Sequence, residues 1–217
     1  APDQNNFLAA IGQSNGELAI AWADMSTGVF QTQTVNEDTI LSTIKRLNPV
    51  EILYPENQQI IESKIKEISN VFPLSKDNFE NKKSNELEKK FFSNKSRIDV
   101  SKLSRAQLSS VNGVLNYLNQ TQITKKPFLH TPVLVEKNRF LEIDPATRQS
   151  LEITRTLSGD KKGCLLNSID KTKTAIGARL LAGRIASPSA IKSEIEGRLD
   201  LVSWFLVQNT IKTDVLS

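Results

Sequence analysis

The chain has 217 residues, a length between that of one domain and two. Apolar residues make up 38%, charged residues make up 24% and the net charge is +4, which is ordinary for a globular protein with a hydrophobic core. No apolar run approaches the roughly eighteen residues of a membrane-spanning helix, and the first six residues lack the basic and apolar segments of a secretion signal.

Residues 7–35 predict three strands joined by short turns. The apolar runs 7–11 and 18–22 flank Ser14-Asn15-Gly16-Glu17, which is a turn signal. A second turn signal, Ser26-Thr27-Gly28, precedes residues 29–35, whose Thr-rich alternation suits a strand with one solvated face. We therefore expect the chain to begin with an antiparallel meander.

The pattern then changes to a helical period. After 36–38, the apolar residues Ile40, Leu41, Ile44 and Leu47 recur at helical spacing before Pro49. Residues 51–55 predict a short strand, and residues 57–69 predict a helix with Ile60, Ile61, Ile65 and Ile68 on one stripe. A strand, a helix and another strand in this order predict an α/β domain with a mixed sheet.

Residues 76–100 are rich in Lys, Asn, Glu and Ser, and 81–85 predict a solvated loop before a short helix containing Leu87, Phe91 and Phe92. Ser101 is the expected N-cap of the next helix, whose apolar positions are 108, 111, 115 and 118. Gly113 lowers helix propensity there, so we expect a close packing contact at this glycine. Residues 121–127 predict a linker, so we expect one domain over 1–125 and another over 126–217.

The second half is expected to be mainly helical. Asp144 before Pro145 predicts an N-cap, and the helix is expected to run through Leu151, Thr154 and Leu157 to 158–160. A short helix at 164–169 and a helix at 175–185 capped by Thr174 follow. Ser189 is expected to start a fourth helix with an inward stripe, formed by Ile191, Ile195, Leu199, Val202 and Leu206. These stripes need partners and the sequence ends at Ser217, so we expect this helical part to be truncated.

Motifs for common catalytic chemistry are missing from the sequence. It contains no Gly-x-x-x-x-Gly-Lys-Ser/Thr loop to bind phosphates. Cys164 is the only cysteine and His130 the only histidine, so neither a disulfide nor a cysteine–histidine zinc site is predicted. His130 is expected to be a surface or packing residue, and a single thiol fits a reducing cytosol.

Asp24 supports the best enzymatic alternative. An aspartate near the end of a strand, followed by α/β units, suggests an RNase H-like metal-dependent nuclease, which needs several carboxylates around two metal ions. Glu51 and Asp77 are the candidates for the other carboxylates, although neither lies in a recognisable motif. The structural interpretation is that the Asp24 side chain accepts hydrogen bonds from the turn that follows it.

Positive charge gathers in the second half. No Lys or Arg precedes Lys45, whereas residues 100–217 contain 17 basic and 10 acidic residues. Lys125-Lys126, Lys161-Lys162 and Lys171 with Lys173 are possible phosphate contacts of a stand-alone nucleic-acid-binding module. The alternative is that these are solvated lysines, and aromatic residues do not interleave with them as in a base-stacking surface.

Several segments carry a family resemblance. Residues 140–153 contain an Asp-x-x-Thr-Arg-x-x-Leu-Glu pattern that begins at Asp144, and 172–181, Pro188 and 195–202 continue the match in order. These segments resemble the opening of the core domain of MutS DNA mismatch repair proteins. Upstream, 6–11 and 23–30 resemble the start of the MutS connector domain, while 57–125 is not distinctive.

The resemblance implies an RNase H-like α/β connector domain without nuclease chemistry, followed by a mainly α-helical partial core domain. It implies that this part links the mismatch-reading and ATPase domains and offers a docking surface for MutL. ATP, Mg²⁺, mismatched double-stranded DNA and a second MutS subunit are implied for the full-length protein, in the cytoplasm. For this part itself the resemblance implies no enzymatic activity, no cofactor and no catalytic or metal-binding residue, and it assigns no DNA-binding residue.

Overall fold

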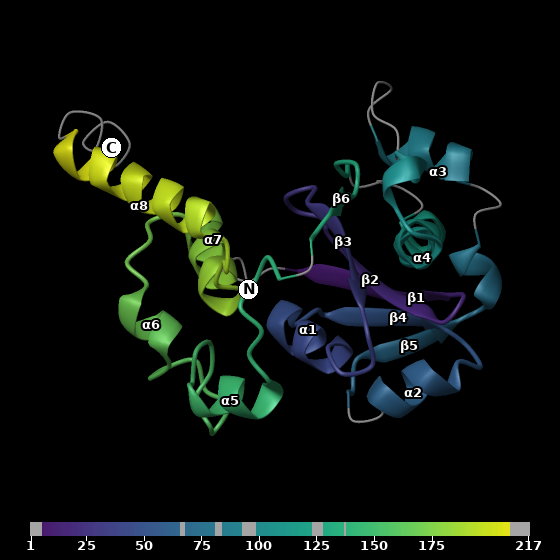
Figure 1. Ribbon diagram of the computed structural model, residues 1–217, viewed down its shortest axis with the longest axis horizontal. Helices are drawn as coiled ribbons and strands as arrows, with labels where there is room; N and C mark the ends of the chain where they lie inside the picture. The colour runs from purple at the N-terminus through teal and green to yellow at the C-terminus, as the bar shows by residue number, and fades with distance from the viewer. Residues whose placement is uncertain are drawn as a thin grey trace. The chain divides into compact units, whose positions relative to one another are not determined.

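The computed structural model describes residues 6–65, 68–80, 84–92, 99–122, 128–136 and 138–208 (Figure 1). The chain divides before Asn138 into two compact units. The N-terminal unit holds the sheet and its covering helices, whereas the C-terminal unit is helical. Each unit is described by itself.

The N-terminal unit contains a mixed six-stranded sheet of order β5-β4-β1-β2-β3-β6. The central three strands are antiparallel and follow one another in sequence, which confirms the predicted meander. The other strands pair in parallel, β4 with β1, β5 with β4, and β6 with β3. The strands are β1 (Phe7–Ser14), β2 (Glu17–Asp24), β3 (Phe30–Val35), β4 (Glu51–Pro55), β5 (Val71–Leu74) and β6 (Val133–Leu134).

Helices cover both faces of this sheet (Figure 1). One face carries Ala10 and its register partners Ala21 and Leu53, and these residues pack in one buried cluster with apolar residues of α4 (Arg105–Thr121). The opposite face is covered by α1 (Ile40–Leu47) and α2 (Gln59–Ile65), and the Arg46 guanidinium lies over the Trp22 ring. The predicted α/β architecture with a mixed sheet is therefore present.

Two glycines allow α4 to approach its neighbours closely. A Cβ added at Gly12 of β1 would clash with Ser110 N and lie 2.6 Å from Ala106 O. A Cβ at Gly113 of α4 would lie 2.6 Å from Phe79 Cε1, which confirms the predicted packing contact. Because each glycine lacks a side chain, α4 can pack in direct contact with β1 at Gly12 and with Phe79 at Gly113.

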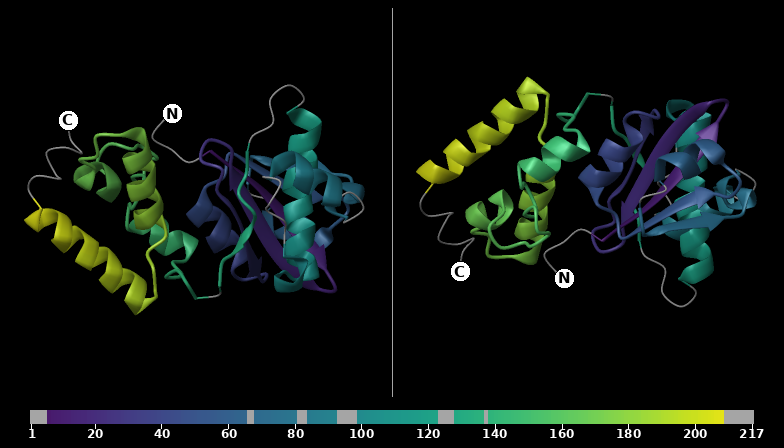
Figure 2. Two further views of the ribbon diagram at one scale, coloured as in Figure 1. Left: turned by 90° about the horizontal axis from the view of Figure 1, so that it is seen from above. Right: turned by 90° about the horizontal axis from the view of Figure 1, so that it is seen from below.

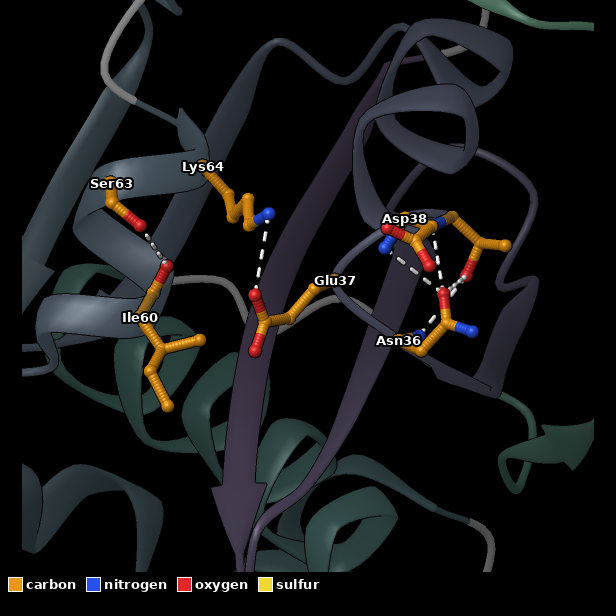
Figure 3. Close-up of polar contacts among 7 residues, drawn as sticks. Asn36, Glu37, Asp38, Ile60, Ser63 and Lys64 are labelled. Carbon is orange, nitrogen blue, oxygen red and sulfur yellow. Dashed lines mark hydrogen bonds and ion pairs between the residues drawn. The ribbon is translucent and has the colours of Figure 1, made fainter.

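Asn36 begins the helical turn that leads into α1. Its Oδ1 accepts hydrogen bonds from the N–H of Asp38 (3.1 Å), the N–H of Thr39 (2.8 Å) and the hydroxyl of Thr39 (2.7 Å). Figure 3 shows this cluster beside Glu37, whose carboxylate forms a 3.3 Å ion pair with Lys64 of α2. The ion pair joins the start of α1 to α2, and the predicted helix over 40–47 is confirmed.

The stripe predicted for α2 is only partly correct. Ile61 and Ile65 are buried, but Ile60 is 41% exposed, and Figure 3 labels it on the same helix as Lys64. Ile68 lies beyond the end of the described helix, and its N–H donates to the carbonyl of Ile65. The described helix has seven residues instead of the predicted thirteen, so its buried stripe is shorter than predicted.

The cap predicted for α4 is wrong. Ser101 lies in a short 3₁₀ helix, η3 (Val100–Lys102), and its hydroxyl donates to Asp99. Ser104 caps α4 instead, because its hydroxyl accepts from Gln107 N–H while the Gln107 side chain accepts from Ser104 N–H. This reciprocal capping box satisfies two backbone donors, which one isolated serine does not.

The short helix before α4 is confirmed as α3 (Ser84–Phe91), and Leu87, Phe91 and Phe92 are buried against α4. The predicted loop over 81–85 is wrong at its last two residues, because the helix begins at Ser84. Residues 81–83 lie outside the described residues. A second 3₁₀ helix, η1 (Lys76–Phe79), brings Phe79 against Gly113.

The outer edge of β5 contains a proline. The carbonyls of Asn70 and Leu74 face β4, because they accept hydrogen bonds from the N–H groups of Ile52 and Glu56. Alternate residues of a strand face the same neighbour, so the backbone of Pro73 faces away from β4. Proline has no N–H, so this outward position lacks a donor. A proline within an apolar stretch also explains why the sequence did not indicate β5.

The C-terminal unit contains four helices among its described residues: α5 (Pro145–Ser150), α6 (Leu165–Ile169), α7 (Ala175–Ala186) and α8 (Lys192–Val207). The predicted caps Asp144 and Thr174 are confirmed, since each side chain accepts a backbone N–H three residues later. The prediction that α5 extends past Leu151 is wrong. Glu152 has a φ of 46°, which interrupts the helix, and its carboxylate accepts from Leu157 N–H.

The inward stripe predicted for the last helix is also wrong. Ile195, Leu199, Val202 and Leu206 are 41–67% exposed, and α8 has no buried residue. Ser189 is not its cap, because α8 starts at Lys192 with Ile191 at the N-cap position. Figure 2 shows α8, in yellow, along the outside of the C-terminal unit. No helix among the described residues is long and apolar enough to cross a membrane.

Candidate functional site

Asp24 closes the turn between β2 and β3. Its side chain is 1% exposed, and Oδ1 accepts hydrogen bonds from Ser26 N–H at 2.8 Å and the Ser26 hydroxyl at 2.6 Å. The backbone of Asp24 also bonds Gly28 and Val29 across the same turn. This confirms the structural interpretation of Asp24, because one carboxylate oxygen already accepts two donors of the turn.

The other candidate carboxylates do not join Asp24. Asp24 pairs with Phe7 and Glu51 pairs with Leu8, so the two acidic residues lie on opposite faces of the sheet. Glu51 accepts a 2.8 Å hydrogen bond from the Tyr117 hydroxyl of α4, and Asp77 lies in η1, which packs against α4. Among the described residues, no three His, Cys, Asp or Glu side chains could hold one metal ion. The nuclease alternative is therefore unsupported.

In the described part of the chain, the basic residues singled out from the sequence lie in two connecting segments on either side of α6. Lys161 and Lys162 are exposed between α5 and α6, while Lys171 and Lys173 are exposed in the connection from α6 to α7. Lys125 and Lys126 lie outside the described residues. His130 is exposed and its ring makes an edge contact with Phe128, which confirms a surface packing role.

The segment that enters the C-terminal unit is fastened to the loop between α7 and α8. Leu141 N–H donates to Pro188 O at 2.8 Å, and Ala190 N–H donates to Arg139 O at 2.9 Å. Phe140 and Ser189 form the bridge between these two bonds. We call residues 139–141 with 188–190 the entry clasp.

Glu194 of α8 reinforces the entry clasp with charge. Its carboxylate lies 3.1 Å from the Arg139 guanidinium and 3.5 Å from the Arg198 guanidinium, and it accepts a 3.0 Å hydrogen bond from the Ser189 hydroxyl. All three charged side chains are about a third exposed or less, at 27–34%. Solvent therefore screens these charges less than it does a fully exposed pair.

Arg148 of α5 makes a further contact with the end of α7. Its guanidinium donates to Ala186 O at 2.8 Å, and partial burial lowers the pKa of Arg148 while leaving it a cation at neutral pH. Arg148 belongs to the motif read from the sequence, but Arg139 and Glu194 were missed. Only the fold brings these two residues together, and no spacing pattern signals such a pair.

Comparison with known proteins assigns both units to one family. The family described as MutS domain II matches residues 6–132, and that described as MutS domain III matches residues 146–217. A DNA mismatch repair protein MutS from Rhodopseudomonas palustris (strain BisB5) is 32% identical over an alignment that covers 98% of this chain. The chain spans 24% of the length of that relative. With matches to two successive domains of the same family, the chain belongs to the MutS family.

Proposed function

We propose that this chain is part of a DNA mismatch repair protein in which it links other domains and catalyses nothing itself. The entry clasp is the observation that carries this proposal. Its backbone bonds tie the polypeptide leaving the N-terminal unit, at residues 139–141, to the loop that directly precedes α8, and Glu194 ties Arg139 to α8 itself. A displacement of this segment therefore pulls on α8 through backbone hydrogen bonds and through the ion pairs of Glu194.

The contacts of the clasp are strong enough to carry such a coupling. Each backbone hydrogen bond contributes on the order of 1 kcal/mol net. An ion pair that is partly shielded from water contributes more than a fully exposed one, whose usual worth is about 0–1 kcal/mol. Couplings between sites in proteins are typically about 1–3 kcal/mol, so a few such contacts suffice.

The N-terminal unit fits an RNase H-like connector domain that has no nuclease chemistry. The antiparallel β1–β2–β3 meander, the parallel β4 and the helices on both faces support this assignment. The separation of Asp24 from Glu51 on opposite faces removes the basis for a two-metal centre. We place the docking surface for MutL on this unit because the resemblance to the connector domain implies it.

The C-terminal unit fits the first part of a larger helical core domain. The buried apolar side chains among its described residues are Ile153, Cys164 and Ala178, whereas most of the large apolar side chains of α7 and α8 are exposed. So few buried side chains do not offset the entropy of ordering four helices. We propose that other segments of the full-length protein cover these faces.

The remaining activities belong to the full-length protein in this proposal. It binds mismatched double-stranded DNA as a dimer and hydrolyses ATP with Mg²⁺, and it works in the cytoplasm. The sequence support for this division is the missing phosphate-binding loop in the present chain. The chain alone is therefore expected to show neither ATP turnover nor a preference for mismatched over matched duplexes, and either activity would contradict the proposal.

The clasp itself is tested by Glu194→Gln, with Glu196→Gln as a matched control. Glu196 forms an exposed ion pair with Lys192 on the same helix, and the side chains of this pair are 58% and 88% exposed. In the full-length protein, hydrogen exchange at Leu141 and Ala190 should accelerate about tenfold in Glu194→Gln, for a loss of about 1.4 kcal/mol, and stay unchanged in Glu196→Gln. Equal exchange in both variants would show that Glu194 does not hold the entry segment.

The consequence for linkage is tested in the full-length protein. Glu194→Gln should weaken the stimulation of ATP turnover by mismatched DNA while leaving turnover without DNA unchanged. Glu196→Gln should behave as the unaltered protein. A stimulation that survives Glu194→Gln would refute the relay through α8.

A further inference from the structure

The chain contains two Asn-Gly dipeptides, and the fold places them in opposite surroundings. Asn15-Gly16 forms the two-residue loop between β1 and β2, because Ser14 and Glu17 are the last paired residues of these strands. Asn112-Gly113 lies inside α4. We propose that Asn15 is a site of spontaneous deamidation in the folded chain, whereas Asn112 is protected by the fold.

The reaction requires only the dipeptide and water. The backbone nitrogen of Gly16 loses its proton and bonds to Cγ of Asn15, and the side-chain amide nitrogen leaves as ammonia. The five-membered succinimide that results then adds water at one of its two carbonyl carbons. Opening at one carbon gives aspartate, and opening at the other gives isoaspartate, in which the main chain runs through the former side chain.

The turn leaves both reacting groups open. Asn15 and Gly16 are exposed, with φ angles of 51° and 80°, as in the type I′ turn typical of Asn-Gly hairpins. In such a turn the flanking pair makes the strand hydrogen bonds, so the Gly16 N–H is not needed for the ladder. A Cβ at Gly16 would find no atom within 4 Å, so no other part of the chain crowds the turn beside the reacting Gly16 nitrogen.

In the second dipeptide, Asn112-Gly113, the side chain, the backbone N–H and the space beside the glycine are all inaccessible. Asn112 is 2% exposed, and the N–H of Gly113 faces the preceding helical turn as a hydrogen-bond donor. The ring of Phe79 and the side chain of Ala10 occupy the space beside Gly113. Asn112 can therefore react only when α4 opens, which multiplies its rate by the small equilibrium constant of that opening.

Conversion of Asn15 has a defined structural effect. Isoaspartate adds a main-chain carbon to a loop that fits two residues, and either product adds a negative charge near Glu17. The register of β1 and β2 is fixed by this turn, and both strands are central in the sheet. We therefore expect the converted chain to be less stable than the original.

The experiment is peptide mapping by mass spectrometry after incubation at pH 8.5 and 37 °C. Trypsin separates the two sites, because no Lys or Arg precedes Lys45, and residues 106–125 form another peptide. Asn15 should gain the mass of deamidation at least about tenfold faster than Asn112, which corresponds to about 1.4 kcal/mol of opening free energy. In concentrated urea the two rates should approach each other, because both dipeptides are then unfolded.

Asn15→Gly is the control variant, since Gly-Gly also forms a type I′ turn but has no side-chain amide. It should fold with unchanged circular dichroism and show no deamidation at position 15. The aged original chain, but not aged Asn15→Gly, should show a lower melting temperature. Deamidation of Asn15 in urea but not in the folded chain would mean that the turn protects it and would overturn the proposal, as would equal rates at both sites in the folded chain.

Discussion

Gly113 of α4 lies against the ring of Phe79, so that a Cβ at this position would be 2.6 Å from Phe79 Cε1 and 3.1 Å from Ala10 Cβ. Three parts of the N-terminal unit meet here, namely α4, the 3₁₀ helix η1 and the central strand β1. The Phe79 ring therefore occupies the space that a side chain at position 113 of α4 would fill.

Gly113→Ala is therefore expected to destabilise the chain, although alanine favours a helix. Overpacking costs about 1–3 kcal/mol, and because two ring carbons of Phe79 would lie within 2.9 Å of the Cβ, we expect a cost in the upper part of this range, above the gain of about 1 kcal/mol in helix propensity. Gly197→Ala is the control, because a Cβ at Gly197 of α8 meets nothing within 4 Å. Urea unfolding should show a loss for the first variant and no loss for the second. A neutral Gly113→Ala would contradict the close contact.

Ser104→Ala should lower the stability of α4 by about 1 kcal/mol, the usual worth of an N-cap. It removes the acceptor of Gln107 N–H and leaves half of the capping box. Ser101→Ala should change the free energy of unfolding by less than about 0.5 kcal/mol, because Ser101 bonds only the exposed Asp99 in the described contacts. Chemical denaturation of both variants distinguishes the two serines, and the opposite ranking would restore Ser101 as the cap.

Asp24→Ala should cost about 1–3 kcal/mol, because the N–H and the hydroxyl of Ser26 lose their acceptor. Asp24→Asn should cost less, since an amide oxygen still accepts from Ser26. Thermal unfolding measures this difference. Magnesium-dependent cleavage of an RNA–DNA hybrid that disappears in Asp24→Asn would show a catalytic role that the turn does not explain.

We expect ionisation of Tyr117 to lower the stability of the folded chain at alkaline pH. Partial burial, followed by the hydrogen bond to Glu51, raises the pKa of Tyr117 above its ordinary value. The folded chain therefore favours the protonated phenol. This contribution is complete below the pKa of the unfolded chain, about 10, and is lost as the pH rises through the higher folded pKa.

The free energy of unfolding should thus fall more steeply above about pH 10 in the original chain than in Tyr117→Phe, which has no phenol to ionise. Glu51→Gln should give an intermediate slope, because it removes the negative charge but leaves the burial. Denaturation series between pH 9 and pH 11.5 provide the measurement. Parallel curves for the original chain and Tyr117→Phe would exclude this linkage.

Local signals in the sequence predicted the parts of the fold that local chemistry decides. Asn15-Gly16 set the first hairpin, and Asp144-Pro145 set the start of α5. The choice between Ser101 and Ser104 as the cap depended on the reciprocal bond from Gln107. Gln107 stands three residues after Ser104 and completes the Ser-x-x-Gln pattern of a capping box, whereas Ser101 is followed at that spacing by another serine. This signal was present in the sequence and the prediction missed it.

Contacts between distant residues were beyond sequence patterns. The ion pair between Arg139 and Glu194 joins an entry segment to a helix that begins about fifty residues later, and nothing in the spacing of either residue indicates the other. The prediction that the apolar stripe of α8 faces inward was wrong for a related reason. An apolar period predicts that a face is to be covered, but it does not say which segment covers it.

The outward-facing Pro73 has a consequence for how the protein behaves in crowded solution. An extended chain that approached β5 from outside would find no N–H at this position, so a continuous ladder of hydrogen bonds could not form there. On the opposite edge, β6 is paired over only two residues. Within the described residues, neither border of the sheet therefore offers a long, regular template, and the folded N-terminal unit is expected to resist growth into fibres by strand addition.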